Sequence, residues 1–200
     1  MRNVSKSVSK RVLQIFPQDI YVKDDVAKLS VSPGHQLSED SLKQYMNLID
    51  TTIGNLYYIM DGKHWKIDKL QEMKEIGLVY ISYETDKLVC FVSVMVVLDH
   101  GIKKLYLYEI HVDPSYQHSK LGTLLMDGVQ KLALDLDSCG DENLSCKGVN
   151  LTVFSANELS YNWYLKRGFR ITDNSPQDRV LRNGTSIKAT YYLMARDNEI

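Results

Sequence analysis

The 200-residue sequence lacks the features that mark several classes of protein. Its three cysteines, Cys90, Cys139 and Cys146, include no CxxC pair, which argues against a disulfide framework or a thiolate metal site and favours a reducing compartment. The 24 Lys and Arg residues nearly balance the 25 Asp and Glu residues, so the chain lacks the basic excess typical of a nucleic-acid binder. The longest apolar run, 88–98, is far shorter than the roughly 20 residues that cross a bilayer. These absences leave one globular domain, large enough to bury roughly 70% of its unfolded surface.

The N-terminal segment is basic and has no acidic residue among its first eleven positions. That composition is typical of an organelle transit peptide, but no apolar stretch follows it as in a secretory signal. We interpret these first eleven residues as a solvated or weakly helical lead-in, with nuclear targeting or contact with an acidic partner as alternative roles. Residues 1–36 as a whole are expected to form a basic N-terminal lead-in and extension. Residues 37–200 are expected to form the folded domain.

Hydrophobic periodicity predicts an α/β fold. Apolar residues recur every three or four positions from Leu42 to Met60, behind Ser38 as a helix N-cap. Further along, β-branched and aromatic residues alternate with amphipathic segments. A strand–helix–strand order implies parallel pairing there, beside antiparallel hairpins. The predicted elements are helices 66–75, 121–136 and 157–166, and strands 78–83, 88–97, 105–112, 148–154, 168–171 and 187–195.

The junction between strand 105–112 and the helix that follows it has features of an anion-binding site. The first turn of a helix carries amide groups without partners and a partial positive charge, so a diphosphate placed there gains several hydrogen bonds. Gly122 has no Cβ and lets a ligand approach the backbone, and Lys120 adds charge. The spacing alone equally fits an ordinary strand-to-helix connection.

This junction resembles the acyl-CoA-binding motif Q/R-x-x-G-x-G/A of the GNAT superfamily of N-acetyltransferases. Gln117 and Gly122 take the first and last positions, whereas Lys120 replaces the first glycine and would either narrow the phosphate cradle or contact phosphate. The spacing of Asn157, Tyr164 and Gly168-Phe169 is similar to the late N…Y…GF segment of the same family. The resemblance covers about residues 78–195 and implies a GNAT fold with acetyl-CoA as cosubstrate and no metal. The cofactor contacts that it implies are Ile110, His111, Val112, Gln117, His118, Ser119, Lys120, Leu121, Gly122, Thr123 and Asn157.

A narrower resemblance is to the NatD-type N-alpha-acetyltransferases, which modify the N-terminal serine of histone H4 and histone 2A. Strand 105–109 looks like their Y-x-Y-E strand, 151–157 fits their LTVF-x-x-N stretch, and 173–176 resembles their D-x-S-P loop. Tyr191 stands where they carry a tyrosine in the final strand. Four segments in the same order make this match specific.

The resemblance implies acetyl transfer to an α-amine, whose pKa of about 8 requires only a modest base. Glu109 is the first candidate for this base, directly or through a water, and His111 is the alternative. A main-chain amide of Ile110 or Val112 would stabilise the oxyanion, and Tyr164 would protonate the leaving thiolate. Asn157 is expected to contact the pantetheine arm, to cap its helix, or both. Tyr106 completes the catalytic candidates; in an ideal strand it shares a face with Tyr108, opposite Glu109, so joint action requires a distorted strand.

The substrate side is expected to be acidic and aromatic, since a histone tail beginning Ser-Gly-Arg-Gly-Lys is cationic after its first two residues. Asp99 would offer one carboxylate. The other candidates for the substrate wall are Tyr58, Tyr106, Tyr108, Thr152, Asn174 and Tyr191.

Three functional hypotheses follow. The first is a histone-tail N-alpha-acetyltransferase, the second a GNAT enzyme for lysine or small amines, and the third a noncatalytic acyl-CoA-binding module, which the lysine at position 120 motivates. The first implies partners in the tails of histone H4 and histone 2A, with the ribosome as a further partner, and a location in both cytoplasm and nucleus. We expect a monomer that binds neither nucleic acid nor membrane directly.

Overall fold

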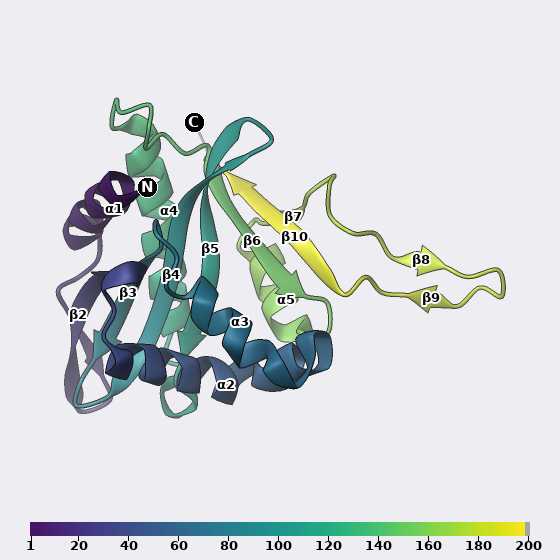
Figure 1. Ribbon diagram of the computed structural model, residues 1–200, viewed down its shortest axis with the longest axis horizontal. Helices are drawn as coiled ribbons and strands as arrows, with labels where there is room; N and C mark the ends of the chain where they lie inside the picture. Colours follow the sequence, from purple (N-terminus) through teal and green to yellow (C-terminus); the bar gives the residue numbers. More distant parts are fainter. Residues whose placement is uncertain (199–200) are drawn as a thin grey trace.

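The computed structural model describes residues 1–198, which form a mixed sheet with helices on both faces (Figure 1). The central sheet has eight strands in the order β1-β2-β3-β4-β5-β6-β10-β7, and all neighbours pair antiparallel except β5 and β6. The strands are β1 (Asp19–Val22), β2 (Asp25–Pro33), β3 (Val79–Glu84), β4 (Leu88–Asp99), β5 (Ile102–Val112), β6 (Gly148–Phe154), β7 (Arg170–Ile171), β8 (Arg179–Val180), β9 (Ser186–Ile187) and β10 (Tyr191–Asp197). The helices are α1 (Arg2–Ile15), α2 (Glu39–Asp61), α3 (Trp65–Glu72), α4 (Leu121–Ser138) and α5 (Glu158–Lys166), with 3-10 turns at Gly34–Gln36, Gly62–His64 and Pro114–Tyr116.

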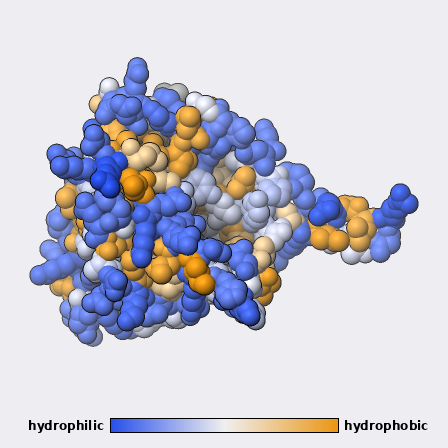
Figure 2. Space-filling model, in the orientation of Figure 1, coloured by the Kyte–Doolittle hydropathy of each residue, from blue (hydrophilic) through white to orange (hydrophobic). Residues whose placement is uncertain are grey.

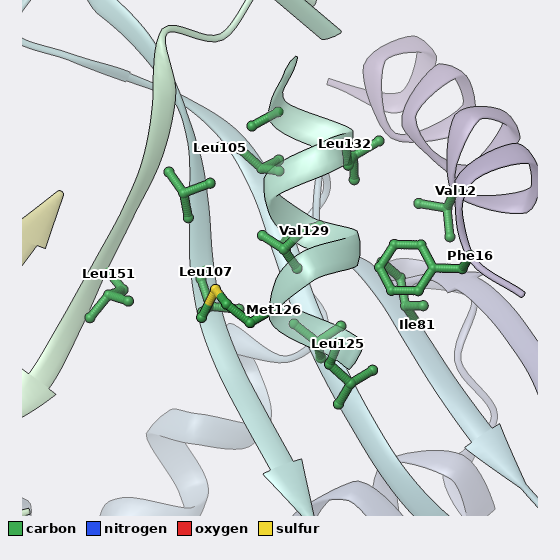
Figure 3. Close-up of a cluster of buried hydrophobic side chains, with 14 of the residues drawn as sticks. Val12, Phe16, Ile81, Leu105, Leu107, Leu125, Met126, Val129, Leu132 and Leu151 are labelled. Carbon is green, nitrogen blue, oxygen red and sulfur yellow. The ribbon is translucent and has the colours of Figure 1, made fainter. Parts of the chain in front are cut away.

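One face of the sheet carries a large apolar core beneath α1, α4 and α5. Leu125, Val129 and Leu132 of α4 follow the helical period and are fully buried against the strands (Figure 3). Leu105 and Leu107 of β5 meet them from the sheet. The opposite face packs against α2 and α3 through a second, more aromatic cluster.

The N-terminal segment belongs to the fold. The first eleven residues are helical, as one of the two interpretations had it, but a solvated lead-in is wrong. Residues 2–15 form α1, whose Val8 and Val12 are buried in the large core. Phe16 packs so closely on α4 that a Cβ at Gly128 would lie 2.3 Å from its Cζ. The chain then adds the hairpin of β1 and β2 to the main sheet. An apolar face at every third or fourth residue of α1 holds the helix on the core in spite of its basic residues.

The region after β7 differs from the expected single loop and strand. Residues 173–190 form an arm that projects from the body and contains the short β8–β9 hairpin (Figure 1). The predicted strand 187–195 is therefore split into β9 and β10. The predicted strand 148–154 and the Ser38 cap, which accepts from the Ser41 amide, are confirmed.

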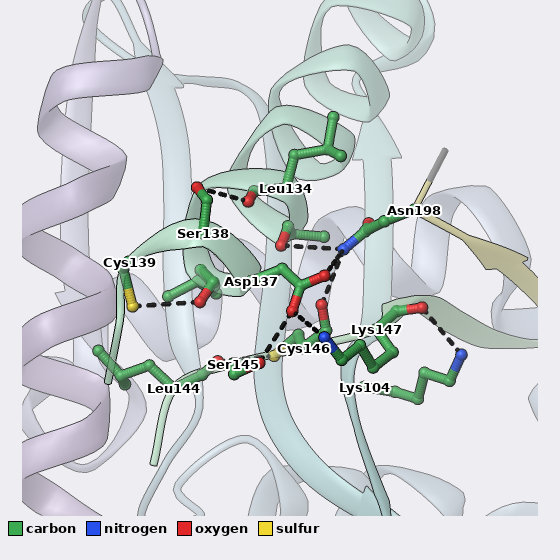
Figure 4. Close-up of polar contacts among 12 residues, drawn as sticks. Lys104, Leu134, Asp137, Ser138, Cys139, Leu144, Ser145, Cys146, Lys147 and Asn198 are labelled. Carbon is green, nitrogen blue, oxygen red and sulfur yellow. Dashed lines mark hydrogen bonds and ion pairs between the residues drawn. The ribbon is translucent and has the colours of Figure 1, made fainter. Parts of the chain in front are cut away.

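A polar cluster fastens the end of α4 to the ends of β6 and β10 (Figure 4). Asn198 Nδ2 donates to the Cys146 carbonyl over 2.8 Å and to Asp137 Oδ2 over 3.3 Å. Asp137 Oδ1 also accepts from Lys147 Nζ and Ser145 Oγ, and the Lys147 bond is the main cause of the lowered pKa of this carboxyl. The cluster fixes the start of β6, which the site requires.

Candidate active site

A cavity opens where β5 and β6 separate. The two strands pair only where Leu105–Leu107 faces Val149–Leu151, although β5 continues to Val112 and β6 to Phe154. Beyond the last pair the strands diverge, as Figure 1 shows, and main-chain groups of β5 lose their neighbours. The cavity along this opening has a volume of about 860 Å³, and its walls come from α2 and α3 on one side and α4 and α5 on the other.

The start of α4 forms one end of this cavity. Lys120 is its N-cap and has φ of +67°, a left-handed conformation that favours glycine and costs a lysine about 1 kcal/mol. No side chain caps α4, so the amides of its first turn face the cavity without a side-chain acceptor. A Cβ at Gly122 would meet only Trp163, 3.9 Å away, so the space over this backbone is open to a ligand. The expected loop residues line the cavity, Ser119 excepted: Gln117, His118, Lys120, Leu121, Gly122 and Thr123.

A β-bulge in β5 brings the catalytic candidates to one face. The register with β4 passes from Val94–Leu107 to Ser93–Glu109, which leaves Tyr108 as the extra residue. Glu109 therefore lies on the α2 and α3 side of the sheet with Tyr106, instead of opposite it. The strand distortion that the sequence required for joint action is present.

Glu109 is the centre of a buried polar cluster. Its Oε1 accepts from the Tyr57 hydroxyl and from Lys69 Nζ, each over 2.7 Å. Its Oε2 is 2.6 Å from Nε2 of His111, whose Nδ1 is 2.7 Å from the Thr52 hydroxyl. The side chains of Glu109, His111 and Lys69 are all less than 10% exposed. The carboxylate is thus held by groups from α2, α3 and its own strand.

The charges in this cluster determine its protonation. Burial alone would raise the pKa of Glu109, but the Lys69 ammonium and the hydrogen bond from His111 lower it to about 2. Burial would likewise lower the pKa of Lys69, yet the charges of Glu109 and Glu72 raise it. Burial and the Glu109 charge raise the pKa of Tyr57, which therefore donates as a neutral phenol. At neutral pH the site holds a carboxylate anion beside an ammonium.

Helix α5 supplies two further candidates. Tyr164 is buried, lines the cavity and packs on Phe169, with ring centroids 5.7 Å apart. Burial, with a contribution from the Glu109 charge, raises the pKa of Tyr164, so its hydroxyl keeps a proton that it can donate. Asn157 caps α5 by accepting from the Ser160 amide over 3.2 Å and also lines the cavity. The capping role is confirmed, and the position also suits ligand contact.

Tyr106 and Tyr108 stand between the large cavity and a smaller one of about 280 Å³. Their rings pack edge to face with centroids 5.0 Å apart, and the Tyr106 hydroxyl lies 2.5 Å from the Thr152 hydroxyl. Asp99 lines the small cavity, where Asn150 donates to it over 2.8 Å. Asn174 lines it too and lies 3.0 Å from His100. The side chains expected to form the substrate wall are therefore mostly together. Figure 2 shows a pale surface of intermediate hydropathy beside the base of the arm.

Two expected contacts are not found in this site. Tyr58 is 60% exposed and lines neither cavity, so its place in the substrate wall stays a prediction. It falls off the apolar stripe of α2, whereas Tyr57 continues that stripe and stacks on Trp65 at 4.9 Å. Tyr191 of β10 lies opposite Phe154 of β6 in the sheet, and it also lines neither the large nor the small cavity.

Sequence reasoning missed Thr52, Lys69 and Glu72. A signal existed for Lys69, because it stands four residues after Trp65 and four before Met73, on the stripe that α3 buries. A lysine on a buried stripe requires a carboxylate partner. The partner could not be identified, since Glu109 is 40 residues away in the sequence and its face depends on the bulge.

Within residues 1–198, no three His, Cys, Asp or Glu side chains gather in a way that could hold a metal ion. No helix of this part of the chain has the length and apolarity to cross a membrane.

Comparison with known proteins agrees with this geometry. Residues 75–171 match the family described as an acetyltransferase (GNAT) domain, a segment that runs from the end of α3 through β7. Among solved structures, the fold is similar to the PaiA N-acetyltransferase from Thermoplasma acidophilum in complex with coenzyme A, with a TM-score of 0.56 and 16% identity over 85% of this chain and 99% of that one. NAA60 from Arabidopsis thaliana in complex with acetyl-CoA gives a TM-score of 0.57 and 14% identity over 85% and 98%. The chain therefore has a GNAT fold, and its residues 75–171 match the GNAT acetyltransferase domain.

One curated relative is closer in sequence. N-alpha-acetyltransferase 40 from Saccharomyces cerevisiae is 34% identical over 172 residues, which cover 74% of this chain and 57% of the relative. The chain thus spans little more than half the length of that relative.

Proposed function

We propose that this protein is an N-alpha-acetyltransferase that moves the acetyl group of acetyl-CoA to the free N-terminal serine amine of histone H4 and histone 2A tails. The observation that carries the proposal is the buried Glu109 anion at the point where β5 and β6 separate, in one cavity with the uncapped start of α4. The similarity to N-alpha-acetyltransferase 40 supports the choice of an α-amine as acceptor.

The two ends of the cavity suit the two substrates. The amides of Leu121, Gly122 and Thr123, with the charge of Lys120, would bind the diphosphate of acetyl-CoA. The pantetheine arm would lie in the opening between β5 and β6, beside Asn157. The acceptor peptide would enter from the side of α2 and α3, past Tyr106 and Tyr108.

The reaction needs a proton acceptor, an oxyanion donor and a proton donor. As the neutral amine attacks the thioester carbonyl, its nitrogen gains positive charge, which the Glu109 carboxylate stabilises before it takes the proton. A main-chain amide of Ile110 or Val112 would donate to the oxyanion. When the carbon–sulfur bond breaks, Tyr164 gives its proton to the thiolate. Both ring nitrogens of His111 are engaged, so His111 acts through Glu109 rather than on the substrate.

Specificity would come from the small cavity. The carboxylate of Asp99, with Asn174 and the ring of Tyr108, would receive the arginine at the third position of the tail. A glycine at the second position would fit against the hydrogen-bonded hydroxyls of Tyr106 and Thr152, where a larger side chain would meet them. We further propose action on these tails at the ribosome and in the nucleus and cytoplasm, by a monomer that binds neither nucleic acid nor membrane.

The test is a peptide panel assayed for thiol release from acetyl-CoA. The panel contains SGRGK, the same peptide blocked by N-acetylation, SPRGK and spermidine. We expect release with free SGRGK alone. Equal rates on the blocked peptide would show a lysine acetyltransferase, activity on spermidine a small-amine enzyme, and binding of acetyl-CoA without release on any acceptor a noncatalytic module.

A further inference from the structure

Helix α3 is built in an unusual way for a helix that only packs against the sheet. It leaves Ile67 57% and Leu70 37% exposed, while it buries the side chain of Lys69 to 7% exposure. A helix placed for stability buries its apolar residues and leaves lysine in water. The orientation of α3 therefore puts one charge into the site at the expense of apolar contact.

The buried ammonium is fully engaged. Lys69 Nζ lies 2.6 Å from Glu72 Oε1 and 2.7 Å from Glu109 Oε1, and it stands 4.7 Å from the centre of the Tyr57 ring. Glu72 belongs to the same helix as Lys69, whereas Glu109 and Tyr57 belong to β5 and α2. The same ammonium thus links α3 to the carboxylate on β5.

We propose that Lys69 is a positioning residue for the acetyl transfer, whose ammonium keeps the Glu109 carboxylate ionised and fixed beside the cavity. This inference rests on the proposed function, because it assigns a task within that reaction. Lys69 acts through Glu109 and takes no proton from the substrate.

Glu109 is surrounded by several titratable groups, and each bears on its charge. Tyr57 from α2 and His111 from β5 donate to the carboxylate, and Glu72 from α3 shares the ammonium. Tyr80 from β3 and Tyr164 from α5 are neutral phenols whose pKa is raised mainly by burial. Among the described residues 1–198, Lys69 is therefore the one lysine or arginine whose charge contacts the Glu109 carboxylate.

The lowered pKa of Glu109 agrees with this assignment, because the Lys69 charge is the largest of the influences that lower it. An opposite charge at this distance lowers a carboxyl pKa by about 1–3 units. Removing the cation leaves a buried carboxylate without a counter-ion, which favours the protonated form. A protonated Glu109 stabilises no positive charge on the attacking nitrogen.

The experiment compares the full chain with Lys69→Met, Lys69→Arg and the control Lys66→Met. Lys66 lies on the same helix and forms an ion pair with Asp50 at the surface, over 2.6 Å, so its loss removes a similar pair away from the site. For each protein, kcat and the peptide KM are measured from about pH 4 to pH 9, since the shifted titration of Glu109 is expected below pH 6. In parallel, the carboxyl signals of ¹³C-labelled glutamate are followed by NMR in the absence of substrate, with Glu109→Gln to assign the Glu109 signal.

We expect Lys69→Met to raise the Glu109 titration by about 1–3 pH units and to move the acid limb of kcat in the same direction. A pKa that rises from about 2 to about 3–5 leaves Glu109 more than about 90% ionised at pH 6, so kcat should change by less than about twofold there. At pH 4 kcat should fall by up to about tenfold, whereas the peptide KM should change by less than about threefold. Lys69→Arg should restore part of the loss because it keeps the charge. Lys66→Met should behave as the wild type.

An unchanged Glu109 titration and an unchanged pH profile in Lys69→Met would overturn the proposal. If Lys69→Met unfolds, Lys69→Arg and Glu72→Gln test the same point: the carboxyl titration must stay low in both, because both keep a cation on Glu109. A raised titration in Glu72→Gln would contradict the assignment. A wild type without acetyl transfer would refute the proposed function, whereas the NMR titration would still decide the coupling between Lys69 and Glu109.

Discussion

The two faces of β5 show what different kinds of side chain do in one strand. Leu105 and Leu107 point into the apolar core beneath α4, where the fit and the apolar contacts of the side chains determine stability. Glu109 and His111 point to the other face, where a carboxylate, an ammonium and a phenol contact one another. The bulge at Tyr108 separates these two patterns. The first half of the strand is built for stability and the second for a charge held in a fixed place.

Burying ionised groups on the site face costs desolvation energy. For Glu109 the ion pair and the hydrogen bonds more than offset this cost, since its pKa is lowered. The apolar face has no such cost, and its helix α4 has almost every inward position filled by Leu, Val, Met or Ala. We therefore expect mutations on the apolar face to lower stability with little effect on the reaction, and mutations on the site face to act mainly on the reaction.

The largest effect is expected from Glu109→Gln. The amide keeps the shape of the side chain but lacks the negative charge and cannot take a proton, so kcat should fall by about 10²–10⁴-fold while the peptide KM changes little. Steady-state kinetics with acetyl-CoA and SGRGK measure this split. Glu142→Gln, in the exposed loop before β6, is the matched control and should be unaffected. A change confined to KM would assign Glu109 to peptide binding instead.

On the apolar face, Leu132→Ala should lower the free energy of unfolding by about 2–5 kcal/mol, because it leaves a cavity beneath α4. The activity per folded molecule should remain close to that of the wild type. Denaturant unfolding at 25 °C gives the stability, and Leu134→Ala, a 44% exposed position on the same helix, serves as control. Equal losses in the two variants would show that α4 does not carry the core.

Acid should affect the two faces differently. The pKa of Glu109 is about 2 in the folded protein, below its unfolded value, so its ionisation stabilises the fold above pH 4–5 and this contribution is lost as the pH falls towards 2. Between pH 5 and pH 3 the wild type should lose about 1–2 kcal/mol more than Glu109→Gln does. Leu132→Ala should show the acid dependence of the wild type. Denaturant unfolding at several pH values measures the difference, and parallel wild-type and Glu109→Gln curves would contradict it.

The difference between the apolar face and the site face also explains which parts of the structure the sequence could predict. The periodic stripes of α2 and α4 and the alternation of the strands predict the apolar face well, since burial repeats along the chain. The site depends on a single bulge and on contacts across the fold, such as that between Lys69 and Glu109, so local pattern cannot place its members. The tyrosine pair of α2 shows the limit, because Tyr57 and Tyr58 are both visible in the sequence, but only their positions on the helix show that Tyr57 lines the large cavity and Tyr58 does not. The arm of residues 173–190 and the docking of α1 were missed for a similar reason, as neither short hairpins nor a basic amphipathic helix gives a strong local signal.

The smallest change in stability is expected from substitution of Lys120, the N-cap of α4, which lies between the apolar face and the site face of the sheet. Its φ of +67° is unfavourable for lysine, so Lys120→Gly should raise the free energy of unfolding by up to about 1 kcal/mol. The same variant should weaken binding of acetyl-CoA, because it removes a positive charge from the proposed diphosphate site. Lys120→Ala separates the two effects, since alanine loses the charge but keeps a strained backbone. Calorimetric titration and thermal unfolding of both variants measure them. If acetyl-CoA binds Lys120→Ala and the wild type equally well, the lysine side chain does not contact phosphate, and its left-handed backbone is then the feature that shapes the loop.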